Sequence, residues 1–280
     1  ERASVEELAA AENWEELNNR FFRTLAFGTG GLRGKTIGAV VTSAERGTPQ
    51  AMGRPEFPCT GTNAMNYYNI GRATQGLVAY VKKWAAAEKL PHRPRICISY
   101  DTRFFSRQFA DLAAQVITEL GCDALVFSGP RPTPQLSFAV RQRGAQAGIN
   151  ITASHNPPAY NGYKVYFNDG GQVVEPHASG IIDEVNAVNS AHSAPLPVAE
   201  QGRRESLGAE MDDAYLDRLE KVVLDPALVA REKGFKIVYS PLHGVGASVV
   251  MPLLARLGFD ATAVPEQLEP DSRFPTVKSP

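Results

Sequence analysis

The amino-acid sequence predicts an α/β protein: a three-layer α/β/α domain with a mixed, largely parallel sheet, followed by the start of a second similar domain. Two observations carry this prediction. From residue 96 onwards, short runs of strand-favouring residues alternate with segments of helical periodicity, which is typical of layered α/β domains. The alternation stops at residues 190–206, where Ser, Ala, Pro, Gly and charged residues dominate, and then starts again. We therefore expect one domain over residues 1–205 and a second over residues 206–280.

The N-terminal segment is predicted to begin with helices. Ser4 can cap a first helix, and Asn13 can cap a second one, with Glu16 at the third position of a capping box. Residues 27–34, F-G-T-G-G-L-R-G, contain too much glycine for regular structure, so we expect a loop that needs positive φ or a close approach to another group. Residues 40–61, with their prolines and glycines, are expected to form an exposed excursion.

Apolar periodicity predicts the remaining elements. In the first domain we expect strands at 96–100, 124–127, 147–151 and 162–167, and helices at 63–89, 108–120, 135–143 and 176–188. In the second domain we expect helices at 211–223 and 247–257, and strands at 235–239 and from 260. Because the second pattern is incomplete at Pro280, we expect the sequence to be part of a longer protein.

Composition excludes several classes of protein. The 29 Lys+Arg and 30 Asp+Glu leave a net charge of -1, which provides no footprint for nucleic acid or an anionic membrane. The 3 cysteines form no C-x-x-C pair, so neither a disulfide framework nor a zinc knuckle is expected. No apolar run has the length of a membrane span, and no secretory leader is recognisable. We therefore expect a cytoplasmic protein that binds any anionic ligand through a local site.

The most informative segment is T-A-S-H-N-P-P at residues 152–158, directly after a predicted strand. Ser154 thus lies at a strand end in a loop stiffened by prolines, where a hydroxyl either caps the next turn or faces a substrate. A hydrolase triad is disfavoured, because no G-x-S-x-G elbow surrounds Ser154 and the side chain of the adjacent His155 is expected to diverge from it.

This segment resembles the active-site serine loop of the α-D-phosphohexomutases, the family of phosphoglucomutase and phosphomannomutase. Other matching segments occur in the same order along nearly the whole chain: F-G-T-G-G-L-R-G at 27–34, G-T-N-A-M-N at 61–66, S-Y-D-T-R-F-F-S at 99–106, N-G-Y-K-V-Y at 161–166 and Y-S-P-L-H-G-V-G at 239–246. The segments at 61–75 and 239–246 most resemble the phosphoglucomutase branch that includes phosphopentomutases.

The resemblance implies four α/β domains around a cleft, and it implies roles for individual residues. Ser154 matches the phosphoserine, and His155 matches a neighbour that contacts phosphate or substrate. Arg33 and Lys164 match cations near the transferring phosphoryl group. Phosphoryl transfer depends on positioning and charge stabilisation, which a guanidinium fork and a lysine can provide. On the residues alone, Arg33 is also compatible with a surface arginine, and Lys164 with a solvated strand position.

Further candidates for substrate or phosphate binding are Thr29, Gly30, Gly31, Asn156, Arg103 and His243. The glycines would let backbone N–H groups approach phosphate oxygens. Arg103, together with Ser106, is equally compatible with a brace behind the site or with a helix-terminal salt bridge. The loop of His243 suits anion binding or a glycine-rich turn.

The resemblance also implies cofactors. Mg²⁺ would bind the phosphate of Ser154 and an aspartate-rich D-G-D-x-D-R loop, but that loop does not occur in these residues. A hexose 1,6-bisphosphate is the expected activator. Because the metal loop and the sugar-recognition loop are missing, we expect residues 1–280 alone to be inactive.

The leading hypothesis is a phosphoglucomutase-like enzyme that transfers a phosphoryl group between C1 and C6 of a hexose phosphate through a bisphosphate intermediate. The alternatives are a phosphomannomutase or phosphopentomutase of the same family, a phosphatase with a serine nucleophile, and a non-catalytic sugar-phosphate-binding homologue. The expected partner is a small sugar phosphate. Neither the identity of the sugar nor the oligomeric state is encoded in these residues.

Overall fold

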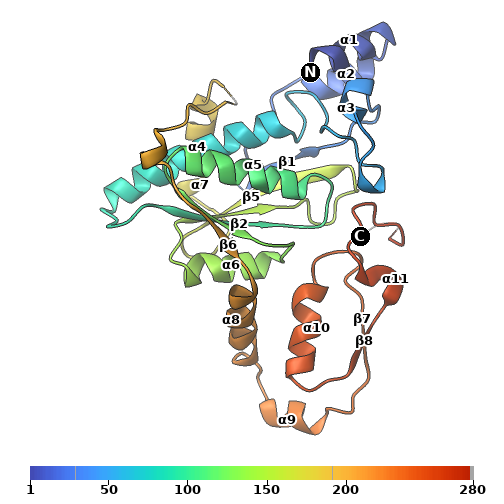
Figure 1. Ribbon diagram of the computed structural model, residues 1–280, viewed down its shortest axis with the longest axis vertical. Helices are drawn as coiled ribbons and strands as arrows, with labels where there is room; N and C mark the ends of the chain where they lie inside the picture. The colour runs from blue at the N-terminus through green and yellow to red at the C-terminus, as the bar shows by residue number, and fades with distance from the viewer. Residues whose placement is uncertain (29, 191, 278–280) are drawn as a thin grey trace.

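A six-stranded sheet forms the centre of the computed structural model, which describes residues 1–28, 30–190 and 192–277 (Figure 1). Its strand order is β1-β5-β4-β2-β3-β6. The strands are β1 (Gly31–Lys35), β2 (Arg95–Tyr100), β3 (Asp123–Phe127), β4 (Ala147–Ile151), β5 (Tyr160–Phe167) and β6 (Arg204–Leu207). β2 pairs in parallel with β3 and β4, and β3 with β6, whereas β5 runs antiparallel to β1 and β4. The predicted mixed, largely parallel sheet is confirmed.

Helices cover both faces of this sheet, which confirms the three layers (Figure 1). One face carries α4 (Tyr67–Ala87), α5 (Ser106–Glu119) and α7 (His177–Ala187), and the other carries α6 (Thr133–Gln142). Successive side chains of β2 point to opposite faces of the sheet, so they contribute to two separate cores. Ile96 and Ile98 join the core beneath α4 and α5. Cys97 between them joins the core beneath α6, together with Leu136.

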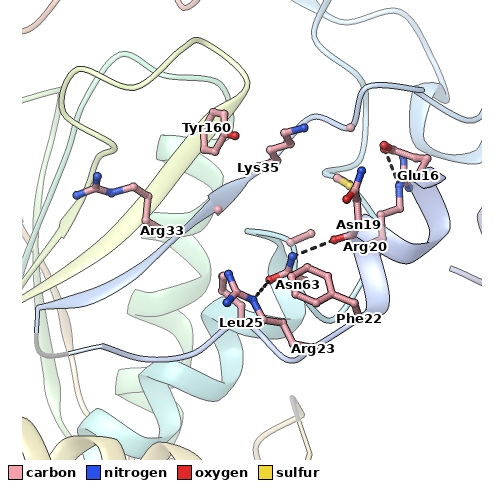
Figure 2. A pocket seen from close by; sticks show the side chains of 14 residues that line it. Glu16, Asn19, Arg20, Phe22, Arg23, Leu25, Arg33, Lys35, Asn63 and Tyr160 are labelled. Carbon is pink, nitrogen blue, oxygen red and sulfur yellow. Dashed lines mark hydrogen bonds and ion pairs between the residues drawn. The ribbon is translucent and has the colours of Figure 1, made fainter.

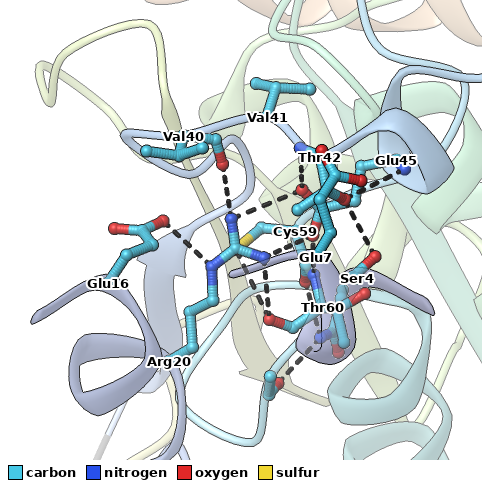
Figure 3. A network of polar contacts seen from close by, with 12 residues as sticks. Ser4, Glu7, Glu16, Arg20, Val40, Val41, Thr42, Glu45, Cys59 and Thr60 are labelled. Atoms are coloured by element: carbon cyan, nitrogen blue, oxygen red, sulfur yellow. Dashed lines mark hydrogen bonds and ion pairs between the residues drawn. The ribbon is translucent and has the colours of Figure 1, made fainter. Parts of the chain in front are cut away.

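A buried ion network fixes the N-terminal helices α1 (Arg2–Ala10) and α2 (Trp14–Phe21) near the edge of the sheet (Figure 3). Arg20 is 3% exposed and donates from Nε to Glu16 at 2.9 Å and from Nη1 to Glu45 at 2.5 Å. Glu45 lies in the short helix α3 (Ser43–Arg46), whose Thr42 cap and Glu45 form a capping box. The network therefore joins α2 to the segment that follows β1.

Several expectations for this N-terminal part need correction. Helix α1 begins at Arg2, so Ser4 lies inside it rather than at its cap, whereas Asn13 caps α2 as predicted. The segment at 40–61 is not simply an exposed excursion, because it contains α3, the 3₁₀ turn η1 (Ala51–Gly53) and the buried Glu45. Its polar side chains are bonded to the rest of the fold, and composition alone does not reveal such bonds.

The glycine-rich segment at 27–34 is only partly a loop, since residues 31–35 form strand β1. Its glycines permit close approach of neighbouring groups within the sheet. Gly31 has φ 127°, and a Cβ there would lie 1.8 Å from the carbonyl oxygen of Tyr163 on β5. Glycine in this strand therefore marks tight packing against β5.

The second unit contains α8 (Ala209–Glu220), α9 (Pro226–Arg231), β7 (Ile237–Tyr239), α10 (Ala247–Arg256), β8 (Ala261–Ala263) and α11 (Pro265–Leu268). β7 and β8 pair in parallel, and Tyr215, Leu216 and Val249 form a small core between α8 and α10. The expected boundary after residue 205 falls within β6, which belongs to the first sheet through Leu207. The expected linker also contains the 3₁₀ turn η2 (Val198–Glu200).

Two further findings concern expectations drawn from composition. Among the described residues, none of the helices combines the length and apolar character needed to cross a membrane. The three cysteines, Cys59, Cys97 and Cys122, are free and buried, and burial raises the pKa of each thiol to about 12.

Candidate active site

The serine loop presents the hydroxyl of Ser154 outward from the end of β4. Ser154 is exposed and has φ 55°, a left-handed conformation that is uncommon for residues other than glycine. Its backbone N–H donates to Thr152 Oγ1 at 3.0 Å. Its Oγ lies 3.4 Å from Nδ1 of His155, so these two side chains do not diverge as expected. The backbone conformation, held by the hydrogen bond to Thr152, thus directs the Ser154 hydroxyl away from the sheet.

A single buried arginine holds the carbonyl groups of this loop. Arg103 is 4% exposed, and its Nη2 donates to the carbonyl oxygens of Ser154 at 2.8 Å and Asn156 at 2.5 Å. Its Nη1 donates to the carbonyl oxygens of Pro157 at 2.9 Å and Tyr160 at 3.2 Å. In this structure the guanidinium therefore braces the loop from behind, instead of lying open to a phosphate as expected for a binding residue.

Asp101 orients this brace. Its Oδ1 accepts hydrogen bonds from the Arg103 N–H at 2.9 Å and from Ser106 Oγ at 2.7 Å, and its Oδ2 lies 3.4 Å from Arg103 Nε. Burial raises the pKa of the Asp101 carboxyl, while these hydrogen bonds act in the opposite direction. The salt bridge that we expected near the start of a helix is thus present between Arg103 and Asp101. The Nη groups of Arg103, however, bond the carbonyl groups of the serine loop.

The second unit completes a cavity in front of the serine loop. This cavity has a volume of about 360 Å³ and is lined on one side by Asp101, Ser154 and His155, and on the other by Leu242 and Phe274. The Arg103 guanidinium carbon lies 5.2 Å from the centre of the Phe274 ring, so one arginine contacts both units. The cavity is large enough for a small phosphorylated ligand.

Thr102 links the same two units by hydrogen bonds. Its hydroxyl donates to the carbonyl oxygen of His243 at 3.1 Å, and its carbonyl accepts from Ser272 Oγ at 2.6 Å. His243 itself is 3% exposed, with Nδ1 3.2 Å from the carbonyl oxygen of Glu269 and Nε2 2.8 Å from Thr276 Oγ1. The structure thus places the imidazole in an internal network, and not at the position expected of a phosphate ligand.

Arg33 and Lys164 share one face of the sheet beside the serine loop. Arg33 pairs with Gly162 in the β1–β5 register, and Lys164 pairs with Gly31. Because paired residues lie on the same face, both cations project from that face. Burial, and next the charge of Arg33, lower the pKa of Lys164. This face therefore carries two neighbouring cations, one of them with a reduced affinity for its proton.

The remaining candidates take varied positions. Gly30 and Gly31 form the turn into β1, where the Gly30 carbonyl accepts from the N–H of Val165 at 3.2 Å and the Gly31 N–H donates to Gly28 at 3.0 Å. Thr29 lies outside the described residues. Asn156 contributes its carbonyl to Arg103, and its buried Oδ1 has no hydrogen-bond partner among the described residues.

The described part of the chain does not by itself form a metal site. It contains no group of three or more His, Cys, Asp or Glu side chains that could hold an ion. Around Ser154 the nearest carboxylate of the cavity, Asp101, is already bonded to Arg103 and Ser106. These residues alone therefore do not match the oxygen-rich, carboxylate-anchored coordination that Mg²⁺ requires.

Sequence reasoning missed two features of this site. Phe274 lies far from Ser154 in the sequence, in a segment without a recognisable motif, and only the fold brings it against Arg103. The attachment of four carbonyl groups to one guanidinium was also missed. A partial signal existed for the second feature, because the segment at 99–106 follows a strand and contains both Asp101 and Arg103.

Comparison with known proteins agrees with this geometry. Residues 59–192 match the family model for phosphoglucomutase/phosphomannomutase, alpha/beta/alpha domain I, and residues 213–280 match the model for domain II. The chain belongs to the α-D-phosphohexomutase family. This membership confirms the resemblance found in the sequence motifs.

Curated and solved relatives of this family extend the comparison. The phosphopentomutase of Homo sapiens is 36% identical over 99% of this chain and 43% of its own length. The phosphoglucomutase of Staphylococcus haemolyticus is 31% identical over 92% of this chain and 42% of its own length. A crystal structure from Thermus thermophilus, with the provisional name phosphomannomutase, has a TM-score of 0.67 at 26% identity and covers 91% of this chain and 48% of that one. The chain thus spans less than half the length of these relatives.

Proposed function

We propose that this chain is the phosphoserine-bearing part of a phosphoglucomutase-like phosphosugar mutase. In this proposal phospho-Ser154 donates its phosphoryl group to a hydroxyl of a hexose phosphate. The resulting bisphosphate then returns its other phosphoryl group to Ser154, so that phosphate moves between C1 and C6. The ligand is a small sugar phosphate, a hexose 1,6-bisphosphate serves as activator, and the cytoplasm is the expected compartment.

The observation that carries the proposal is the geometry of the serine loop in a member of this family. A left-handed Ser154 exposes its hydroxyl, and one buried guanidinium holds three carbonyl groups of the loop and the carbonyl of Tyr160 at the start of β5. Such rigidity suits phosphoryl transfer, because that reaction depends on the position of the nucleophile more than on covalent chemistry by other groups. A serine that merely caps a turn would not need this arrangement.

The cations on the neighbouring face have complementary roles in the proposed reaction. As the Ser154 Oγ–P bond breaks and the sugar O–P bond forms, negative charge spreads over the equatorial oxygens. The Arg33 guanidinium can stabilise that charge with paired N–H donors. The proton of the attacking sugar hydroxyl must also leave, and the lowered pKa of Lys164 suits this side chain to receive it and later to return it.

Magnesium dependence is part of the proposal only through the family resemblance. When bound, the ion would neutralise charge on the transferring phosphoryl group. Ser154, through its phosphate, is the residue of this chain that we expect to contact it. Since the described residues form no cluster of metal-ligating side chains, we assign no step of the reaction to the ion.

A phosphopentomutase is the second candidate function. It is favoured by a specific observation, namely that curated relatives with this name are 36% identical to the chain over 99% of its length. Parallel assays of the full-length protein with glucose 1-phosphate and ribose 1-phosphate distinguish the two, since the preferred substrate will have the higher kcat/KM. Release of inorganic phosphate without isomerisation would instead indicate a phosphatase.

The central test is the fate of Ser154 in the full-length protein. After incubation with hexose 1,6-bisphosphate, we expect peptide mapping to place a phosphate on Ser154. We expect Ser154→Ala to lower mutase activity by roughly 10⁴-fold or more, as loss of a nucleophile does. Ser179→Ala, at an exposed serine of α7, is the matched control and should be fully active. A label on another residue, or an active Ser154→Ala protein, would refute the assignment.

A further inference from the structure

Both polar backbone groups of Ser154 are bonded to side chains of the fold. Its N–H donates to Thr152 Oγ1 at 3.0 Å, and its carbonyl oxygen accepts from Arg103 Nη2 at 2.8 Å. The N–H lies in the peptide plane before the Ser154 Cα and the carbonyl in the plane after it, so the two bonds together restrain φ and ψ. Arg103 also bonds the carbonyl of Tyr160, at the start of β5 beside β1 (Figure 2). The left-handed conformation of Ser154, with φ 55°, is therefore imposed by its surroundings.

The Thr152 hydroxyl is itself held in place. Thr152 directly follows β4 and is 8% exposed, and its N–H donates to the carbonyl oxygen of Gly162 on β5 at 3.1 Å. The two substituents on its Cβ restrict rotation about χ1. Burial raises the pKa of the Asp101 carboxyl, and a hydrogen bond with the Thr152 side chain opposes this shift. Because an ionised carboxylate only accepts hydrogen bonds, the one hydroxyl proton is donated to Asp101, and the lone pairs remain for the Ser154 N–H.

Asp101 receives hydrogen bonds from two directions. Its own N–H donates to the carbonyl oxygen of Ile151 at 3.1 Å, which places it beside the end of β4. Its Oδ1 accepts from Ser106 Oγ at 2.7 Å, and Ser106 Oγ accepts in turn from Nδ2 of the fully buried Asn161 at 2.9 Å. One chain of hydrogen bonds thus connects the carboxylate to the interior of the sheet, and a second runs through Thr152 to the amide of the nucleophile.

We propose that Thr152 is a positioning residue for phosphoryl transfer, which holds the Ser154 hydroxyl in its reactive direction through the Ser154 amide. This inference rests on the proposed role of Ser154 as the nucleophile. The left-handed conformation has a steric penalty for residues with a Cβ, so Ser154 relaxes to an ordinary conformation if one of its two restraints is lost. Rotation of the backbone moves the attached hydroxyl, and phosphoryl transfer is sensitive to such a misplacement.

The hydroxyl of Thr152 is tested by Thr152→Val, which removes it at nearly constant shape, and by Thr152→Ser, which keeps it. In the full-length protein, with the preferred substrate of glucose 1-phosphate and ribose 1-phosphate, we expect Thr152→Val to lower kcat by roughly 10²-fold. KM should change less than about twofold, because the lost contact acts on the nucleophile. Thr152→Ser should stay within about threefold of the wild-type kcat. A hydroxyl that only stabilises a turn would lower the melting temperature and leave kcat unchanged.

Hydrogen exchange of the Ser154 amide gives a second readout, which needs no turnover. Since a bonded amide must open before it exchanges, we expect exchange at least about tenfold faster in Thr152→Val and a wild-type rate in Thr152→Ser. NMR of ¹⁵N-serine-labelled protein measures this rate. The matched control is Thr118→Val, which removes a hydroxyl bonded to the carbonyl of Ala114 within α5 at 3.1 Å. It should change neither kcat nor the exchange of the Ser154 amide.

The possible outcomes separate this inference from the proposed function. If the wild-type protein neither isomerises a sugar phosphate nor accepts phosphate on Ser154, the proposed function fails and the inference fails with it. If the wild-type protein is active and Thr152→Val equals it in kcat, or if the exchange of the Ser154 amide is unchanged, the inference alone is wrong. Melting temperatures verify folding. If Thr152→Val does not fold, Thr152→Ala removes the same hydroxyl with a smaller side chain, and the same two readouts decide.

Discussion

The serine loop and the β1 edge use arginine in opposite ways. Behind the serine loop, Arg103 is buried and gives four hydrogen bonds to backbone carbonyl groups. At the β1 edge, Arg33 is exposed and forms no ion pair within the described residues. One guanidinium therefore acts as part of the protein interior, and the other is available to an anion from solution.

This difference shows what distinguishes a positioning residue from a binding residue. Both arginines follow or lie within short motifs that resemble the same family, so the motif alone does not separate their roles. The distinction lies in how many donors the fold has already used. A binding residue needs donors that remain free and accessible in the folded protein, whereas both Nη groups of Arg103 are already bonded to backbone carbonyl groups.

The largest effect is expected from Arg103→Met, which keeps most of the side-chain volume but removes the donors. Loop carbonyl groups would lose their partner and Asp101 would lose its counter-charge, so we expect a loss of about 3–5 kcal/mol in the free energy of unfolding. Urea denaturation of the full-length protein measures this loss. Activity should also fall, because the serine would no longer be held in position.

Arg107→Met provides the comparison for this substitution. Arg107 lies four residues further along and pairs with Asp111 at 2.8 Å, but the two side chains are 51% and 38% exposed. Such a surface pair contributes less than about 1 kcal/mol. If the two variants lose the same stability, the brace contributes nothing beyond an ordinary ion pair.

A smaller effect is expected from Lys164→Ala, which removes a cation beside the β1 edge. We expect kcat to fall by roughly 10², with little change in the free energy of unfolding. The step that needs protonated Lys164 should be lost as the pH rises through its pKa, which lies below the usual value because of burial and the charge of Arg33. The pH dependence of kcat checks this, with Lys236→Ala as a control. A change in KM alone would restrict Lys164 to binding.

The smallest expected effect is that of Arg33→Gln on the free energy of unfolding. Since the guanidinium is exposed and forms no ion pair with the described residues, the free energy of unfolding should change by less than about 0.5 kcal/mol. The pKa of Lys164 should rise, but only in part, because burial is the larger cause of its depression. Titration of the Lys164 Nζ resonance measures this shift, and an unchanged value would mean that the two cations do not interact.

The sequence predicted most of the fold because its core elements have strong local signals. The strands around Ile98 and Ile149 are short apolar runs, and α4 has a long helical apolar rhythm. By contrast, β1 and β6 were missed. β1 is rich in glycine for reasons of close packing, and β6 is a polar strand at the edge of the sheet, where it pairs with β3.

The sequence motifs proposed residues for the candidate site but did not predict how these residues are arranged. Motifs identified Ser154, Arg33 and Lys164, and the structure places the two cations on one face of the sheet. The internal bonding of Arg103 and His243 was not predictable, because it depends on carbonyl groups and on a segment at 269–276 that the chain brings together only in three dimensions.

The contacts of Thr102 and Phe274 have a thermodynamic consequence for the whole molecule. Thr102 and Arg103 contact the second unit, and Arg103 also bonds the carbonyl groups of the serine loop, so Arg103 takes part in both sets of contacts. If docking of the second unit changes the affinity of the serine loop for a ligand, that ligand must change the docking equilibrium by the same factor, because linkage is reciprocal. Arg103 is the residue through which such a coupling between Ser154 and the second unit would pass.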